Sequence, residues 1–232
     1  MDTKSSTTDP VTEIDRASER VIVEHLLAAR PDDGVLGEEG SDLPSRSGVR
    51  WVIDPLDGTV NFLYGYPAHA VSIAAEVDGE VAAAVVHDTS RAEVFTAVLG
   101  RGAHLDGRPI SANRPAGLAC SLLGTGFGYD PARRRWQAEV LTGLIDVVRD
   151  LRRGGSAAID LCSVACGRLD LFYEVGLNRW DMAAGALIAS EAGSTACWEP
   201  EVPRLLVAPP TLLPAFRDAI RDAERRAGPL PP

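Results

Sequence analysis

The segment that most constrains this chain is residues 51–62, Trp-Val-Ile-Asp-Pro-Leu-Asp-Gly-Thr-Val-Asn-Phe. Its apolar start, Val52–Ile53, predicts a buried strand. Pro55 has no amide proton to donate to a strand ladder and biases the residue before it toward extended geometry, so we expect the strand to stop at Asp54. The segment therefore predicts carboxylates placed at the end of a buried strand.

The same segment brings oxygen ligands and free amide groups together. Asp54 and Asp57 are three residues apart, and the Leu56 carbonyl lies between them. Carboxylate and carbonyl oxygens are the ligands that Mg²⁺ prefers. Gly58 permits close backbone approach and, with Thr59, would open a helix whose free N–H groups can hold an anion. An isolated Asp-Pro or Asp-Gly is usually only a polar turn, but the complete string predicts a metal site beside a phosphate site.

This string resembles the first signature of the inositol monophosphatase family, W-x-x-D-P-[IL]-D-G-T-x-N-F, and every fixed position matches. The resemblance implies an α/β (α+β) sandwich of alternating helix and sheet layers. It implies one domain over residues 1–232, with metal motifs and an antiparallel sheet in about 1–115 and alternating helices and strands in about 116–232. It also implies a lithium-sensitive phosphatase that uses two to three Mg²⁺ ions and a metal-activated water.

The first carboxylate of the N-terminal region is Asp15. Residues 13–30 predict a helix that ends before Pro31, and in that setting Asp15 alone could be a first-turn residue favoured by the helix dipole. However, residues 9–15 resemble the family element D-x-V-T-x-x-D. The resemblance implies that Asp15 orients Thr59 and helps to hold an additional Mg²⁺. Family members usually carry about thirty largely helical residues before this element, which are missing from this sequence.

A second acidic motif follows the strand predicted at Val35–Leu36. Adjacent glutamates after a glycine are usually a solvated turn, and the sequence here is Gly-Glu-Glu at 37–39. The family has the same three residues at this point. The resemblance implies that Glu38 is a metal ligand next to the attacking water and, with Thr59, takes its proton.

The middle of the chain predicts consecutive strands at 70–77, 80–87 and 93–98. Asp78-Gly79 is the two-residue signal for a type I′ hairpin. We expect an antiparallel sheet packed on one side by helices.

The second half predicts a strand at 121–124, helices at 131–151 and 156–166, and a strand at 169–173. Gly155, Ser156 and Ala157 would place amides at a helix N-terminus, which suits a phosphate or a hydroxyl, although a plain cap explains them nearly as well.

The segment from 180 to 185, Trp-Asp-Met-Ala-Ala-Gly, resembles the second family signature, W-D-x-A-x-G. Asp181 by itself could be only a helix cap. The resemblance makes it a further carboxylate of the metal site and makes Glu174 an acceptor for the substrate's ring hydroxyls. Taken together, the resemblance implies metal ligands and substrate contacts at two sets of residues: Glu38, Asp54, Leu56, Asp57 and Asp181 for the metal, and Lys4, Asp57, Gly58, Thr59, Gly155, Ser156, Ala157 and Glu174 for the substrate.

Composition excludes several other classes. The formal net charge of 232 residues is −10, without a long basic run, which argues against nucleic-acid binding. The four cysteines lack zinc-site spacing and indicate reduced thiols in a cytoplasmic protein. No apolar run approaches the ~18 residues that span a bilayer, so we expect no membrane partner. From the resemblance we expect a homodimer.

The substrate remains open among related phosphate esters. Inositol monophosphate is the first candidate, and histidinol phosphate, fructose 1,6-bisphosphate and 3′-phosphoadenosine 5′-phosphate are alternatives. A non-enzymatic alternative is a regulatory protein that binds a transcription or RNA-processing partner. Retention of all the metal ligands favours the enzyme.

Overall fold

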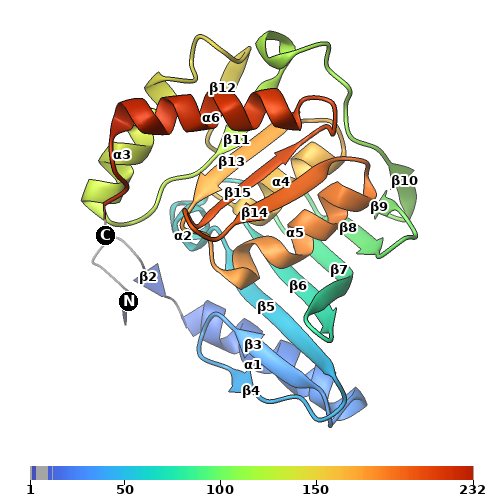
Figure 1. The fold of residues 1–232 in the computed structure, drawn as a ribbon. Coiled ribbons are helices and arrows are strands. Elements are labelled where there is room, and N and C mark those ends of the chain that lie inside the picture. Colours follow the sequence, from blue (N-terminus) through green and yellow to red (C-terminus); the bar gives the residue numbers. More distant parts are fainter. Residues whose placement is uncertain (1, 4–9, 12, 232) are drawn as a thin grey trace.

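The computed structural model describes residues 2–3, 10–11 and 13–231. Predictions for Lys4 and for the Asp9 and Thr12 positions of the first acidic element lie outside these residues. Within them, the structure is a layered α/β sandwich built on two large sheets, which confirms the predicted fold class (Figure 1). A separate pairing of two-residue strands, β1 (Asp2–Thr3) with β2 (Pro10–Val11), precedes the first helix.

The first large sheet has eight strands in the order β10-β9-β8-β7-β6-β5-β3-β4. All neighbours are antiparallel except β3 and β5. The strands are β3 (Gly34–Gly37), β4 (Asp42–Leu43), β5 (Val49–Asp57), β6 (Ala70–Val77), β7 (Glu80–Asp88), β8 (Glu93–Val98), β9 (Ala103–Leu105) and β10 (Arg108–Ile110).

The second large sheet has five strands in the order β12-β11-β13-β15-β14. Strands β12, β11 and β13 are parallel to one another, and β15 and β14 continue the sheet in antiparallel pairs. The strands are β11 (Leu122–Thr125), β12 (Asp150–Arg152), β13 (Leu171–Val175), β14 (Thr195–Glu199) and β15 (Arg204–Ala208), and a 3₁₀ turn at Leu118–Cys120 precedes β11.

Helices separate and cover the two sheets. The helices are α1 (Glu13–Ala29), α2 (Thr59–Tyr64), α3 (Pro131–Thr142), α4 (Ala157–Ala165), α5 (Arg179–Glu191) and α6 (Leu213–Ala227). Helices α4 and α5 lie between the sheets and share one apolar core with both. Helices α3 and α6 cover the outer face of the second sheet and share a separate core with it.

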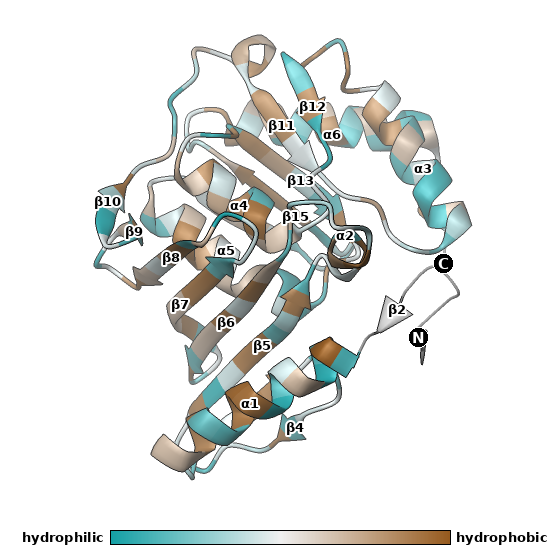
Figure 2. Ribbon diagram, turned by 180° about the vertical axis from the view of Figure 1, so that it is seen from behind, coloured by the Kyte–Doolittle hydropathy of each residue, from teal (hydrophilic) through white to brown (hydrophobic). Residues whose placement is uncertain are grey.

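Helix α1 covers the other face of the first sheet. Side chains alternate between the faces of a strand, and in β6 Ala70 and Ala74 join the core beneath α5 while Val71 and Ile73 line a groove with α1. Figure 2 shows α1 with both hydrophilic and hydrophobic residues, as expected for a helix with one packed face. The prediction that helices pack on only one side of this sheet was therefore wrong.

The hairpins and most boundaries agree with the sequence. Strands β6 and β8 coincide with the predicted ranges, and β7 is one residue longer. Asp78 and Gly79 have φ values of 52° and 87°, as a type I′ turn requires. Among the described residues no helix is long and apolar enough to cross a membrane, and all four cysteines are free.

Strand β5 does not stop at Asp54, contrary to the prediction. It continues through Pro55 to Asp57, and its pairing with β6 shifts register between Asp54 and Asp57. Proline is tolerated at such an irregularity because its missing amide proton has no ladder position to fill. The shift places two carboxylates next to the interrupted part of the ladder.

The predicted helix at 131–151 was also wrong in length. Helix α3 ends at Thr142, and residues 150–152 form β12 at the edge of the second sheet. At Gly143 a Cβ atom would lie 2.9 Å from the Ala223 Cβ of α6, so α3 ends at a point of close contact with α6. Strand β13 runs two residues later than predicted, which puts Glu174 inside the strand instead of after it.

Candidate active site

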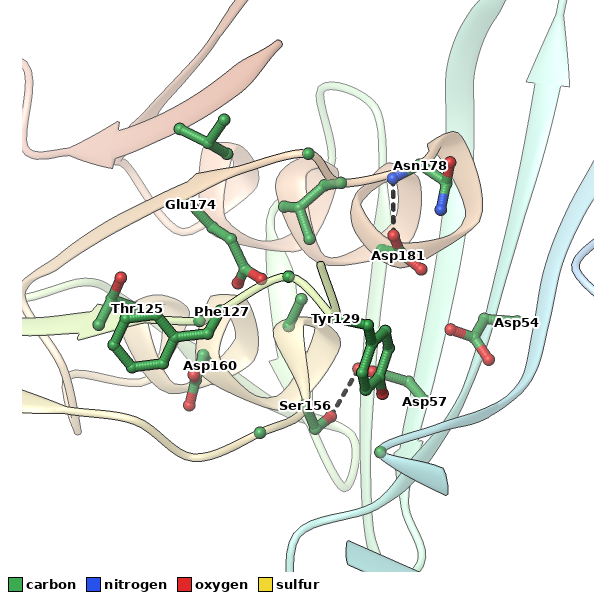
Figure 3. A pocket seen from close by; sticks show the side chains of 18 of the residues that line it. Asp54, Asp57, Thr125, Phe127, Tyr129, Ser156, Asp160, Glu174, Asn178 and Asp181 are labelled. Carbon is green, nitrogen blue, oxygen red and sulfur yellow. Dashed lines mark hydrogen bonds between the residues drawn. The ribbon is translucent and has the colours of Figure 1, made fainter. Parts of the chain in front are cut away.

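One pocket gathers the motifs at the junction of the two sheets (Figure 3). Its volume is about 470 Å³. The walls come from the end of β5, the start of α2, the loop after β11, the start of α4, the end of β13 and the start of α5. Residues that line the pocket include Glu38, Asp54, Leu56, Asp57, Gly58, Thr59, Gly126, Arg133, Arg153, Gly155, Ser156, Ala157, Asp160, Glu174, Asn178 and Asp181.

Strand β5 supplies the first three oxygen donors. Asp54 is 2 % exposed, and its Oδ1 accepts a hydrogen bond of 3.1 Å from the backbone N–H of Leu56. This bond folds the Asp-Pro-Leu segment back on itself, so Asp54 and the following Asp57 both face the pocket.

The turn after β5 depends on Gly58. Its φ is 90°, a left-handed conformation, and a Cβ atom there would lie 2.7 Å from the Ala68 carbonyl oxygen. Thr59 then begins α2. Its hydroxyl lies 3.0 Å from Asp15 Oδ1 and 3.1 Å from the Leu56 carbonyl oxygen. The contact that Asp15 needs to orient Thr59 is therefore present, and the catalytic role of the pair remains a prediction.

Asp57 also lies at the N-terminus of α4. Its Oδ2 accepts hydrogen bonds from Ser156 Oγ (2.6 Å) and from the Ala158 backbone N–H (2.7 Å). These donors come from the segment predicted to contact substrate through Gly155, Ser156 and Ala157. As drawn in Figure 3, Ser156 therefore contacts the Asp57 carboxylate directly.

Asp181 has a similar position at the start of α5. Its Oδ2 accepts a hydrogen bond of 2.6 Å from the Asn178 backbone N–H. The helix cap is Asn178, and Asp181 is the third helical residue of a capping box, so the alternative that Asp181 is the cap itself was wrong. Asp181 also faces the pocket, and its capping-box bond is compatible with a role as a metal ligand.

Glu38 reaches the pocket from the end of β3. Its backbone N–H donates to the Ile53 carbonyl oxygen at 3.1 Å, and its carboxyl group lies within interaction distance of Asp54. Four carboxyl groups, those of Glu38, Asp54, Asp57 and Asp181, therefore share one wall of the pocket. We call them the carboxylate cluster.

Crowding raises the pKa values of three members of the carboxylate cluster. Burial is the largest cause, and repulsion by neighbouring carboxylates adds to it. The pKa of Asp54 is well above its usual value, that of Asp57 is about 6 although Ser156 and Ala158 lower it, and that of Asp181 is about 8. Asp54 is buried and the other two residues are partly exposed toward the cavity, but all three carboxyl groups are surrounded by protein. A cation would favour the charged forms.

The donor set suits a hard divalent cation such as Mg²⁺, because it consists of carboxylates and one carbonyl. Among the described residues, no group of three or more acidic, His or Cys side chains already has the spacing of a metal cage. Asp57 and Asp181 each accept their helix hydrogen bonds through Oδ2 (Figure 3). A carboxylate has a second oxygen that can bind a cation, so the donor chemistry, not the present spacing, supports the metal prediction.

Glu174 points into the opposite side of the pocket (Figure 3). A Cβ atom on Gly126 would collide with its carboxylate, so the glycine makes room for it. The pKa of Glu174 is well above its usual value because of burial and, next, repulsion by Asp181 and Asp160. The predicted role of Glu174 as a substrate contact remains a prediction.

Sequence reasoning missed three charged residues of the pocket. Asp160 is 6 % exposed, and burial with repulsion by Asp57 raises its pKa to about 7. Arg153 faces the Asp160 and Glu174 carboxylates, whose pKa values it lowers. Arg133 Nε is buried without a hydrogen-bond partner among the described residues. Asp160 lies in the first turn of α4. No spacing rule points to either arginine.

Comparison with known proteins gives one consistent result. Residues 1–213 match the model of the inositol monophosphatase family. Inositol-1-monophosphatase SuhB of Mycobacterium tuberculosis is 52 % identical over 200 residues, which cover 82 % of this chain and 69 % of that protein. Nus factor SuhB of Pasteurella multocida is 45 % identical over 197 residues, covering 84 % and 74 %. The solved structure of Mycobacterium tuberculosis SuhB superposes with a TM-score of 0.83 at 45 % identity, covering 90 % of this chain and 84 % of that one.

The raised carboxyl pKa values predict how stability depends on pH without divalent cations. Asp57, Asp160 and Asp181 have folded pKa values of about 6, 7 and 8, against ~4 in an unfolded chain. At pH values between the unfolded and the folded pKa values, the folded state binds more protons than the unfolded chain, so the free energy of unfolding falls as pH rises. We expect a lower urea midpoint at pH 8.5 than at pH 6 in EDTA, and a smaller difference in Mg²⁺.

The matched variants for this measurement are Asp181→Asn and Asp218→Asn. Asp218 is exposed and lies outside the pocket. Asp181→Asn should flatten the pH dependence by at least about 1.4 kcal/mol, the equivalent of one pKa unit, while Asp218→Asn should leave it unchanged. Equal stability of the unmodified protein at both pH values in EDTA would contradict the raised pKa values.

Proposed function

Since this chain belongs to the inositol monophosphatase family, we propose that it is a Mg²⁺-dependent phosphomonoesterase whose first candidate substrate is inositol 1-phosphate. The observation that carries the proposal is the carboxylate cluster, which shares one pocket with Thr59, the residue whose hydroxyl is hydrogen-bonded to Asp15. A protein with a formal net charge of −10 needs bound cations to attract a phosphate into such a pocket.

The carboxylate cluster and the Leu56 carbonyl are the groups that would hold Mg²⁺, with Asp54 shared between two ions. Bound Mg²⁺ would supply positive charge and Lewis acidity to the attacking and leaving oxygens of a phosphoryl transfer. A third ion near Glu38 and Asp15 follows from the resemblance. The protein's own contribution is to hold the oxygen ligands of the carboxylate cluster together in one walled cavity.

Proton transfer is the task that we assign to Glu38 and Thr59. The Thr59 hydroxyl has two acceptors within 3.1 Å, Asp15 Oδ1 and the Leu56 carbonyl oxygen. A hydroxyl that donates to one of them presents its lone pairs to the pocket and can accept a proton from water. Glu38 is the final proton acceptor in this proposal, because its carboxyl group lies in the pocket beside Asp54.

Substrate binding divides between the two sides of the pocket. The amides of Gly58 and Thr59 would contact the phosphate, together with Asp57. Glu174 would accept hydrogen bonds from hydroxyl groups of the alcohol, and Ser156 and its neighbours would border the space between. This division supports a polyhydroxylated alcohol such as inositol, since a buried carboxylate is best satisfied by several O–H donors.

A second substrate class is favoured by the pocket arginines. Neither Arg133 nor Arg153 forms an ion pair among the residues that the structure describes, although both line the pocket. Guanidinium groups bind phosphate through paired hydrogen bonds. A substrate with a second phosphate, such as fructose 1,6-bisphosphate or 3′-phosphoadenosine 5′-phosphate, would use them. Histidinol phosphate is the remaining alternative.

The relatives named Nus factor SuhB favour a further candidate, a regulatory role through a transcription or RNA-processing partner. A panel of inositol, sugar, histidinol and nucleotide phosphates separates the candidates. Release of phosphate with Mg²⁺ supports the enzyme, and the preferred ester identifies the class. No release from any ester would favour the binding role.

The expected homodimer is tested separately by sedimentation. Sedimentation that shows only a monomer would contradict this expectation.

The variant Asp57→Asn tests the metal role of the pocket. It keeps side-chain volume but removes a charge, so we expect a folded protein with activity lowered by at least about a hundredfold, as loss of several kcal/mol of charge stabilisation requires. Steady-state phosphate release at saturating Mg²⁺ measures it. The exposed Asp218→Asn variant should keep normal activity. Near-normal turnover of Asp57→Asn would show that Asp57 serves only to cap α4.

The variant Glu174→Gln tests recognition of the alcohol. One hydrogen bond to a charged acceptor is worth about 1.5–3 kcal/mol, so kcat/KM for inositol 1-phosphate should fall about ten- to a hundredfold. An aryl phosphate without those hydroxyls should lose much less. An equal loss for both substrates would assign Glu174 to the metal site or to the fold and would remove the best support for inositol.

A further inference from the structure

Glu19 is a buried acid outside the pocket that none of the motifs includes. It lies on α1 one helical turn after Asp15 and is 4 % exposed. Its two carboxylate oxygens accept hydrogen bonds from the backbone N–H groups of Glu39 (2.8 Å) and Ser41 (3.0 Å). Each oxygen thus binds one amide of the loop that carries Glu38.

The end of β3 is shaped to admit this carboxylate. A Cβ atom on Gly37 would collide with the Glu19 carboxyl group, so any larger residue would push the acid away from the loop. Gly37 also donates its backbone N–H to the Ser41 carbonyl oxygen at 2.7 Å, which closes the loop at its base. The glycine before Glu38 is therefore required by Glu19 and not only by the turn.

No cation neutralises Glu19 among the described residues, since it forms no ion pair there. The two loop amides are its hydrogen-bond donors. A buried charge held only by backbone donors is costly to leave unsatisfied, so it fixes the positions of those donors. The loop from 38 to 41 is thereby tied to α1 at two points.

Glu38 lies between the fixed points. Its own N–H is bonded to Ile53 of β5, and the next N–H along the chain is bonded to Glu19. Asp15 and Glu19 are four residues apart, and positions i and i+4 share one face of a helix. Helix α1 therefore contacts two parts of the pocket machinery from one face, through Thr59 and through the Glu38 loop.

We infer that Glu19 is a positioning residue that holds the Glu38 carboxylate in place for divalent-cation binding and proton transfer. The inference rests on the proposed function for its catalytic part, while the loop-positioning part stands on geometry alone. Groups that orient a metal ligand typically change metal affinity or activity ten- to a hundredfold when they are mutated.

The chain offers a matched control at Glu191, at the end of α5. Its two carboxylate oxygens accept the N–H groups of Gly100 (2.8 Å) and Gly102 (2.7 Å), the same two-amide arrangement on a loop outside the pocket. Glu19→Gln and Glu191→Gln remove the same charge and leave one amide facing an NH₂ group. A purely structural role would give both variants the same consequences.

The experiment compares the two variants in urea unfolding, Mg²⁺ calorimetry, amide hydrogen exchange and kinetics. Both should lose stability. Glu19→Gln alone should raise the Mg²⁺ dissociation constant and the Mg²⁺ concentration for half-maximal activity by about tenfold. It should also speed hydrogen exchange at the Glu39 and Ser41 amides. The KM for the phosphate ester at saturating Mg²⁺ should stay unchanged. Glu191→Gln should change none of these pocket properties.

Equal Mg²⁺ affinities of the two variants would overturn the inference and leave Glu19 as a structural anchor. If Glu19→Gln does not fold, Glu19→Asp, which keeps the charge but shortens the side chain by one methylene, gives the same comparison. If the unmodified protein releases no phosphate from any ester, the proposed function fails. The calorimetric and exchange measurements then still decide whether Glu19 positions the loop.

Discussion

Mutual repulsion of like charges is the constraint on which this structure depends. The four members of the carboxylate cluster face one pocket, and three of them have pKa values raised by burial and by their neighbours. Such an arrangement lowers the stability of the folded state unless a cation binds there. The sheets, the bulge in β5 and the helix starts are best understood as the means by which the chain tolerates this concentration of charge.

Helix N-termini provide part of that tolerance. Asp57 accepts amides at the start of α4, and Asp181 accepts an amide at the start of α5. The free amides and dipole of a helix N-terminus favour negative charge. The two central helices therefore join the sheets, form the apolar core and stabilise two members of the carboxylate cluster. Helix α1 contacts the same site through two acids. Asp15 accepts a hydrogen bond from the Thr59 hydroxyl, and Glu19 accepts one from the loop that carries Glu38.

The sequence predicted the layered fold, the hairpin at Asp78-Gly79 and the start of α2 after Gly58 because each follows from a local pattern or from the signature string. Asp54 and Asp57 were brought together by their spacing in one segment, whereas Glu38 and Asp181 joined them only through the resemblance, since residues so far apart in the chain have no common spacing. The path of β5 through Pro55 depends on a register shift with β6, and the end of α3 depends on the approach of α6. Glu19, Asp160 and the pocket arginines were missed because their partners are distant in sequence.

The most direct test of the account is anomalous diffraction from crystals of this protein soaked in Mn²⁺, a cation with the same preference for oxygen ligands as Mg²⁺. The account predicts anomalous peaks within coordination distance of Asp54, Asp57 and Asp181. Glu38 and the Leu56 carbonyl should complete the ligands. Crystals that show no anomalous peak among these carboxylates would contradict it.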